Sequence, residues 1–278
     1  MSKLRVIMFE TPHDGYFNIA FEEALARAKG CNLIDDTLRF FRNKNAVIIG
    51  YFQKAEEEVN LDYLKKIDAQ LIRRPTGGGA VYHDLGNLNY SIAVSNNRSK
   101  YISPVDYIFS ELIKGPINAL NSLGFDTKLE NINDIVVNNR KVSGTAASTS
   151  WNALFFHGAM LLNTDMERLS SVLKISQKKL IDKGVSSVKY RVTNLFEINN
   201  NISVEDIIKA FVNSYKELLS YDDVYYSIPN RKEIELANLL YDEKYSKEEW
   251  NFNRVSHSKF KQLEEQINNI CNERKFFW

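Results

Sequence analysis

The chain has 278 residues, of which 44% are hydrophobic, and this is enough to bury a sizeable core in one large domain or in a domain with a small appendage. Its 36 lysines and arginines nearly balance its 35 aspartates and glutamates, so no global basic field exists to recruit nucleic acid. The N-terminus carries no cleavable signal pattern and no apolar run is long enough to span a membrane, so we expect a cytoplasmic protein that is not membrane-bound.

Cysteine and histidine are sparse. Cys31 and Cys271 lie far apart in the sequence and form no disulfide framework, which fits a reducing cytoplasm. The four histidines, at positions 13, 83, 157 and 257, show no metal-ligand spacing. We therefore expect neither a disulfide framework nor a metal centre built from these side chains.

The first part of the chain predicts short strands around one amphipathic helix. Leu4–Phe9 is a short apolar run typical of a strand. Apolar residues then recur at helical spacing over 17–28, with Asn18 as the candidate cap and Gly30 as the stop. The polar run Lys54–Glu58 is predicted to be a solvated surface turn. Further strands are predicted at 38–41, 46–50, 70–74, 80–83 and 88–94.

The second part predicts a broken helix, a group of strands and further helices. Ser103 can cap a helix that has proline at its first position, and Gly115–Pro116 should kink or break this helix. A capping box of Ser203 and Asp206 predicts another helix over 204–220. The strands expected here are 127–129, 134–137, 141–147 and 153–162, with shorter helices at 166–173 and 177–183. We therefore predict an α+β fold with a central mixed or antiparallel sheet flanked by helices.

Beyond Pro229 the sequence becomes charged and helical. Phe260, Leu263 and Ile267 mark one face of a terminal helix that ends in three aromatic residues at 276–278. A helix usually buries its apolar stripe on its own domain, and we favour this over an interface for a partner.

The stretch that indicates chemistry is Arg73-Arg74-Pro75-Thr76-Gly77-Gly78-Gly79, followed directly by Ala80-Val81-Tyr82-His83-Asp84 and continuing through Gly86-Asn87 to Asn89-Tyr90-Ser91. Consecutive glycines suit a turn with positive φ, or bare main chain that lies against a ligand. Arginine offers a planar fork of donors, and the N–H groups of a glycine turn can form a concave anion site beside it. An isolated Gly-Gly-Gly would more simply be the flexible tip of a hairpin, and the two arginines before it would be solvated. The length and order of this motif favour a ligand site.

This run closely resembles the signature of the lipoate-protein ligase A family, which is related to the biotin-protein ligases. Further landmarks follow in the order of that family over about the first 250 residues. They are Asn18, Ala20, Glu22 and Glu23; residues 47–50 with Gln53; Asn133-Asp134; Lys141–Ala146; His157-Gly158; residues 183–188 and 191–194; and Trp250-Asn251. The resemblance implies a biotin/lipoate-protein ligase-like catalytic domain over residues 1–250 and a short helical tail over 251–278 in place of an accessory domain.

The resemblance implies a reaction in two halves. Lipoate and ATP would give lipoyl-AMP and pyrophosphate, and a lysine of an apo lipoyl domain would then take the lipoyl group. The acceptors implied are the E2 subunits of 2-oxoacid dehydrogenases and the glycine cleavage H protein. Lys141 would contact the acyl carbonyl and the α-phosphate, and would polarise the mixed anhydride for attack by an amine. Without the resemblance, a lysine that begins a strand is by default a solvated charge.

The resemblance also implies the binding residues. Arg74 would bind phosphate, while Arg73 is equally a structural ion-pair partner. Asn133 and Asp134 would face the phosphates, with Asp134 as a ligand of Mg2+, or would simply form a turn. The main chain and small side chains that would wrap the adenylate belong to Thr76, Gly77, Gly78, Gly79, Ala80, Val81, Tyr82, Ser143, Gly144, Thr145 and Ala146. The lipoate pocket would include His83, His157 and Gly158. On the sequence alone, His83 is equally a hydrogen-bonded structural residue. His157-Gly158 would have the same sequence pattern if it belonged to a strand of the core.

Two other functions stay open on the sequence alone, namely an octanoyl or lipoyl transferase that takes its acyl group from a carrier or from a lipoylated protein, and a non-catalytic binder of lipoyl-adenylate. The transferases use a cysteine nucleophile near the acyl pocket, and neither cysteine lies in the central motifs. The presence of both Lys141 and Arg74 argues against a mere binder. Only 27 residues follow Asn251, whereas longer family members carry an accessory domain there, so activation of lipoate is expected to need a separate small accessory subunit or the short tail.

Overall fold

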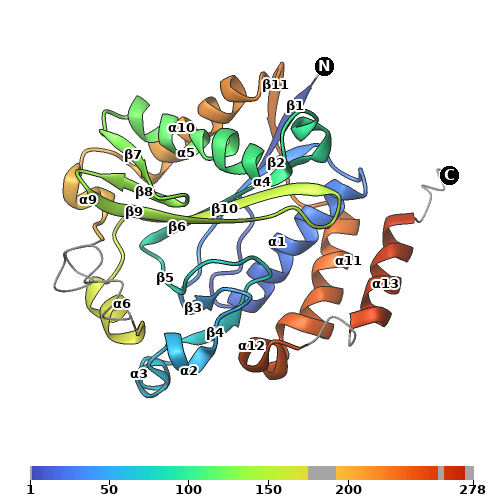
Figure 1. Cartoon of the computed structure of the whole chain (residues 1–278), viewed down its shortest axis with the longest axis horizontal. Helices are drawn as coiled ribbons and strands as arrows, with labels where there is room; N and C mark the ends of the chain where they lie inside the picture. The colour runs from blue at the N-terminus through green and yellow to red at the C-terminus, as the bar shows by residue number, and fades with distance from the viewer. Residues whose placement is uncertain (1, 175–191, 256–259, 273–278) are drawn as a thin grey trace.

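The structure is a computed structural model that describes residues 2–174, 192–255 and 260–272. The helix predicted at 177–183 and the aromatic residues at 276–278 lie outside these ranges. Two β-sheets are covered by helices, which confirms the predicted α+β class (Figure 1). No helix in the described ranges is both long and apolar enough to cross a membrane.

The larger sheet has eight strands in the order β11-β1-β2-β6-β10-β9-β8-β7. β1 runs parallel to both of its neighbours, and every other neighbouring pair is antiparallel. This confirms the predicted central mixed sheet. The strands are β1 (Lys3–Ile7), β2 (Asp36–Phe41), β6 (Asn87–Ser95), β7 (Thr127–Glu130), β8 (Asp134–Val137), β9 (Arg140–Ser148), β10 (Ala153–Leu161) and β11 (Asp223–Tyr226).

The glycine-rich stretch joins two strands of a separate three-stranded sheet. β4 (Gln70–Arg73) precedes the glycines and β5 (Val81–Asp84) follows them, as the sequence predicts. They do not pair with each other, because β3 (Asn45–Ile49) lies between them, parallel to β4 and antiparallel to β5. The glycine-rich stretch is therefore a loop that crosses from one side of β3 to the other, and not the tip of a hairpin.

Helix α1 (Gly15–Gly30) is buried along most of its length. Its cap is Asp14, whose carboxylate accepts from the backbone N–H of Phe17 at 3.1 Å. The prediction of Asn18 as the cap is wrong, because the Asn18 amide is buried and donates to the side chain of Asn43 at 2.7 Å. Asn18 instead ties the start of α1 to the turn that follows β2.

The capping predictions for two later helices are confirmed. Ser103 accepts from the backbone N–H of Asp106, and Ser203 forms a reciprocal capping box with Asp206. The predicted break falls just before Gly115–Pro116, where a π-helical turn separates α4 from α5 and leaves the proline in the first turn of α5. Residues 55–58 form a short helix where a turn was predicted. The remaining elements are α2 (Ala55–Glu58), α3 (Leu61–Lys66), η1 (Asn96–Ser99), α4 (Pro104–Tyr107), η2 (Ile108–Leu112), α5 (Lys114–Ser122), α6 (Met166–Val172), α9 (Leu195–Ile198), α10 (Val204–Leu218), α11 (Arg231–Leu240), η3 (Tyr241–Tyr245), α12 (Glu248–Asn253) and α13 (Lys261–Asn272).

The two faces of the large sheet are covered by different elements. Strand β6 alternates between them, with Tyr90 and Ile92 packed in a cluster that includes α5 and α10, and Ala93 packed with α1. Figure 1 shows α5 and α10 on one side of the sheet, and α1 and the small sheet on the other. Because side chains alternate along a strand, Asn89 and Ser91 face the side of the small sheet.

The C-terminal helix α13 packs on the domain, as expected for its apolar face. Leu263 and Ile267 are buried in the cluster that contains α1. Cys271 forms a disulfide with Cys31, which directly follows α1. The expectation that the cysteines form no disulfide is therefore wrong, because the fold brings together two residues that are 240 positions apart in the sequence.

Candidate active site

A cavity of about 470 Å3 lies between the large sheet and the small sheet. Strands β6, β9 and β10 line one wall, and β3, β5 and the glycine-rich loop line the other. The cavity brings together most of the residues that the sequence singled out. These are Arg74, Gly79, Ala80, Val81, His83, Asn133, Asp134, Lys141, Gly144, Thr145, Ala146, His157 and Gly158.

Five predicted residues do not line this cavity. Thr76 and Gly77 line a second, aromatic-rich cavity of about 420 Å3 on the other side of the loop, and Gly78 lies against the guanidinium of Arg74. The other two are held by hydrogen bonds inside the domain. The Tyr82 hydroxyl donates to the Asn45 side chain at 3.1 Å, and the hydroxyls of Ser143 and Tyr90 are 3.1 Å apart.

The wall formed by the large sheet contains one row of residues that crosses five strands. The strand register pairs Phe41 with Asn89, Asn89 with Ala159, Ala159 with Gly144, and Gly144 with Asp134. All five line the cavity. The third and fourth positions are alanine and glycine, so the row forms a trough that has longer side chains at both ends.

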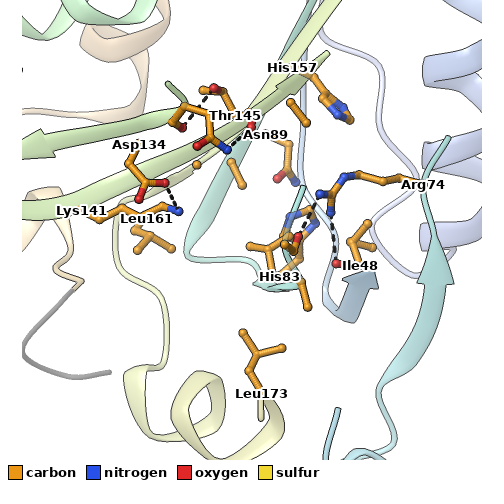
Figure 2. Close-up of a pocket in the computed structure, with 18 of the residues that line it drawn as sticks. Ile48, Arg74, His83, Asn89, Asp134, Lys141, Thr145, His157, Leu161 and Leu173 are labelled. Atoms are coloured by element: carbon orange, nitrogen blue, oxygen red, sulfur yellow. Dashed lines mark hydrogen bonds and ion pairs between the residues drawn. The ribbon is translucent and has the colours of Figure 1, made fainter. Parts of the chain in front are cut away.

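Lys141 lies over the glycine of this row. Its Nζ is 2.5 Å from a carboxylate oxygen of Asp134, and a Cβ on Gly144 would lie 2.8 Å from the same Nζ. Asp134 is nearly buried, with 7% of its side chain exposed, while Lys141 keeps 25%. Figure 2 shows the ammonium of Lys141 paired with Asp134 at the edge of the cavity. The missing side chain of Gly144 leaves room for this positioned charge.

Arg74 organises the glycine-rich loop from inside. Its guanidinium donates to the carbonyls of Gly77 at 2.6 Å, Gly79 at 2.9 Å and Ile48 at 3.3 Å. Gly78 has a φ of +90°, and a Cβ there would lie 2.9 Å from the same guanidinium. Burial lowers the pKa of Arg74 to about 10, which leaves it charged at neutral pH. Its predicted contact with phosphate stays a prediction.

Arg73 joins the loop to the segment around the Trp-Asn landmark. The fully buried guanidinium donates to the carbonyls of Trp250, Asn251 and Phe252 at 2.9–3.1 Å. The Trp250 indole N–H donates back to the carbonyl of Arg73 at 2.9 Å. Arg73 thus has a structural role. It fulfils this role by donating hydrogen bonds to main-chain carbonyls, and not by the ion pair that the sequence suggested.

A chain of hydrogen bonds connects the loop with β10 and α1. The hydroxyl of Thr76 lies 2.8 Å from Nε2 of His157, and Nδ1 of His157 lies 3.0 Å from Oε2 of Glu22. Because a carboxylate only accepts, Nδ1 carries the proton in this arrangement and the Thr76 hydroxyl donates to Nε2. His157 therefore links the glycine-rich loop to helix α1 at one end of the cavity.

His83 and Asn89 contribute buried polar atoms that have no partner in the described structure. Nδ1 of His83 lies 3.0 Å from the Asn43 amide nitrogen, whereas its Nε2 has no partner. Both polar atoms of the Asn89 amide lack one, at 2% exposure. Burial and the charge of Arg74 lower the pKa of His83 to about 3, so its imidazole is neutral.

Sequence reasoning missed several residues of the cavity wall, namely Ile19, Phe41 and Leu161, and it noted Glu22, Ile48 and Asn89 only as parts of motifs without assigning them to the site. A signal for Asn89 exists in the sequence, because polar residues alternate with apolar ones along Asn87–Ser91. In a strand that both faces bury, such alternation indicates one polar face.

The described residues contain no group of three or more His, Cys, Asp or Glu side chains placed to hold a metal ion. Asp134, the predicted Mg2+ ligand, is already paired with Lys141. A single carboxylate fits a Mg2+ site in which most of the oxygen ligands come from substrate phosphates and water.

Residues 14–216 match the family described as the lipoyl protein ligase A/B catalytic domain. The chain belongs to this family. Among curated relatives, lipoate-protein ligase A subunit 1 from Thermoplasma acidophilum is 39% identical over 259 residues, which cover 89% of this chain and 95% of that protein.

Solved structures give the same family. One is a bipartite lipoate protein ligase, with its E2 lipoyl domain, from Thermoplasma acidophilum; it is similar with a TM-score of 0.81 at 37% identity, covering 92% of this chain and 98% of that chain. A lipoate-protein ligase A bound with ATP has a TM-score of 0.79 at 35% identity, covering 92% and 100%. The predicted family and fold are confirmed.

Proposed function

We propose that this protein is an ATP-dependent lipoate-protein ligase, which activates lipoate to lipoyl-AMP and transfers the lipoyl group to a lysine of an apo lipoyl domain. The observation that carries the proposal is the ammonium of Lys141, held by Asp134 above the bare backbone of Gly144 at the edge of a cavity between the two sheets. Relatives with the same fold are named as lipoate-protein ligases.

The cavity suits an acid with an apolar chain. Away from Lys141, apolar side chains line it, including those of Ile19, Phe41, Ile48 and Val81. The chain of the acid lies among these residues, and its carboxylate lies beside the lysine. Burial of the chain holds the carboxylate in place, so that activation occurs between oriented groups.

ATP binds with its α-phosphate beside the same lysine. Attack of the carboxylate on this phosphate brings two anions together, and the ammonium of Lys141 offsets their repulsion. Asn133 and Asp134 face the phosphates, and Asp134 would hold Mg2+, which would supply further positive charge there. Thr145 and Ala146 continue the wall beside the adenylate.

Lys141 then serves the transfer half-reaction. Its positive charge polarises the acyl carbonyl of the adenylate toward the attacking amine. E2 subunits and the H protein are the acceptors that this reaction implies. Because one relative is named as a subunit and another as bipartite, a separate accessory subunit assists the activation step. We place the protein in the cytoplasm, with its ATP and its acceptors.

The octanoyl transferase alternative needs a cysteine nucleophile at the acyl carbonyl. Both cysteines are joined in a disulfide, and neither lines the cavity. A ligase that forms no covalent enzyme intermediate is therefore the better supported function.

The test is pyrophosphate release by the purified chain with ATP, Mg2+ and lipoate, followed by lipoylation of an apo lipoyl domain with and without added lipoyl-adenylate. We expect efficient transfer from the adenylate and slow pyrophosphate release by the chain alone. Rapid pyrophosphate release would refute the need for an accessory subunit, and failure to transfer from the adenylate would refute the ligase itself.

A further inference from the structure

The unpartnered polar atoms of Asn89 and His83 point to a role in the reaction. Both residues line the cavity and are less than 5% exposed. Buried polar groups in folded proteins nearly always have a hydrogen-bond partner, so groups left without one at a cavity wall are poised for a ligand. Figure 2 shows both side chains directed into the cavity, on the side away from Lys141.

The strand register places Asn89 opposite Lys141 across the trough. Asn89 pairs with Ala159 and Ala159 with Gly144, above which the Lys141 ammonium lies. Neighbouring strands are about 4.8 Å apart, so the backbone of Asn89 stands roughly 10 Å from that of Gly144. Along this row of the sheet, only the methyl group of Ala159 and the glycine at 144 lie between Asn89 and the ammonium. A carboxyl-sized group fits in this space.

Hydrogen bonds behind His83 make it a donor toward the cavity. The side-chain oxygen of Asn43 accepts from Asn18 at 2.7 Å, so its nitrogen is the donor to Nδ1 of His83 at 3.0 Å. The remaining proton of the neutral imidazole is therefore on Nε2, which is the unpartnered atom. The side-chain nitrogen of Asn89 is a second donor on this side of the cavity.

We propose that Asn89 and His83 donate hydrogen bonds to the acyl oxygen of the bound adenylate, from the side opposite Lys141. This inference rests on the proposed function and adds two catalytic residues to it. As the amine nitrogen of the acceptor lysine forms the new C–N bond, the carbonyl oxygen takes the π electrons. The oxygen then returns these electrons to re-form the carbonyl as the C–O bond to phosphate breaks, AMP leaves with the electron pair of that bond, and the surplus amine proton passes to water. Donors already in place stabilise the charge on the oxygen without reorganising.

Asn89→Leu tests the proposal, because leucine has a similar size and no donor. Single-turnover transfer from preformed lipoyl-adenylate to an apo lipoyl domain should slow about 100-fold, the usual effect of losing one such donor. The affinity for the adenylate, measured by calorimetry, should change by less than about 3-fold, because the contact strengthens only as charge develops. The variant should melt at the same or a higher temperature, because it removes an unsatisfied buried amide.

Two further variants make the test sharp. Asn89→Asp keeps the shape of the side chain and replaces the donor with an acceptor, so its transfer rate should be as low as that of Asn89→Leu. This variant keeps the proposal testable if the leucine variant folds poorly. Ser91→Ala is the matched control, since Ser91 is a buried and unpartnered residue on the same strand and face, but lies outside the cavity lining. Its transfer rate should stay within about 2-fold of the wild type.

The possible outcomes separate the two proposals. Rates for Asn89→Leu and Asn89→Asp that match the wild type would overturn this inference and leave the ligase function intact. A rate loss matched by an equal loss of affinity would also overturn it, since Asn89 would then only bind the substrate. A wild-type chain that transfers nothing from the adenylate would overturn the proposed function and this inference with it.

Discussion

Lys141 and Asp134 form an ion pair of 2.5 Å at the edge of the cavity, with the ammonium above Gly144. A solvated lysine at the start of a strand would sample many positions, whereas this one is held by a nearly buried carboxylate. A fixed charge costs no reorganisation when negative charge develops beside it. The pair therefore turns an ordinary strand lysine into the electrostatic centre of the site.

Lys141→Ala should abolish transfer from lipoyl-adenylate while the fold stays intact. We expect the single-turnover rate to fall at least about 100-fold, because the charge on the acyl oxygen loses its nearest cation. Lys128→Ala is the control, since Lys128 lies on the edge strand β7, which pairs with β8, and its side chain is 64% exposed. Unchanged transfer in Lys141→Ala would refute the assigned role.

Gly144→Ala tests the position of the ammonium and not its charge. The added methyl would lie 2.8 Å from Nζ of Lys141, so the lysine must move away from the trough. We expect transfer to slow by about 10-fold or more, since a displacement of an ångström is costly in an oriented site. Circular dichroism should remain that of the wild type. A variant as fast as the wild type would show that the lysine works from another position.

The buried, neutral His83 predicts a specific pH dependence of stability. Its pKa is lowered to about 3, whereas a histidine in the unfolded chain titrates near 6.5. Below about pH 6.5 the unfolded chain takes up a proton that the folded protein does not. The free energy of unfolding is therefore highest above this pH and falls as the pH drops, with a slope approaching about 1.4 kcal/mol per unit for this residue.

Urea unfolding between about pH 7.5 and 5 measures this slope, in a window that avoids most of the carboxylate titration. His83→Phe should unfold with a shallower dependence on pH than the wild type, since the other histidines are present in both proteins. Equal slopes would mean that His83 is not held neutral by the fold.

The disulfide between Cys31 and Cys271 should stabilise the protein without serving the reaction. It closes a loop of 240 residues, and no described residue of α13 lines the active cavity. Loss of such a bond typically costs about 2–5 kcal/mol, so Cys31→Ser should melt at a lower temperature. Transfer from the adenylate should be retained. Two reactive thiols in the denatured, unreduced protein would contradict the bond.

Local sequence signals predicted most strands and the capped helices. The cap at Ser103 and the capping box at Ser203 form as expected, because the partner of each lies three residues away. The prediction of Asn18 as a cap is wrong because an asparagine amide can serve equally well as a buried hydrogen-bond donor. Here it donates to the side chain of Asn43, which lies 25 residues further on. The path of the glycine-rich loop depends on β3, which pairs with both flanking strands, and such pairing leaves no local signal.

The candidate site was predicted through its motifs, and its geometry was not. The family resemblance singled out Lys141 and Asp134, while their contact depends on a register between β8 and β9 that only the fold fixes. Asn89 lies in the continuation of the glycine-rich motif but had no predicted role, and its role is inferred from the row of small residues that separates it from the lysine. The disulfide was missed for the same reason, because proximity across 240 positions is a property of the fold.

The most direct measurement is the mass of an apo lipoyl domain after incubation with the purified chain and preformed lipoyl-adenylate. We predict that one lysine gains one lipoyl group, that the gain depends on the chain, and that Lys141→Ala eliminates it while Lys128→Ala does not. An unmodified domain with the wild-type chain, or equal modification with Lys141→Ala, would contradict the assignment of this cavity as the site of lipoyl transfer.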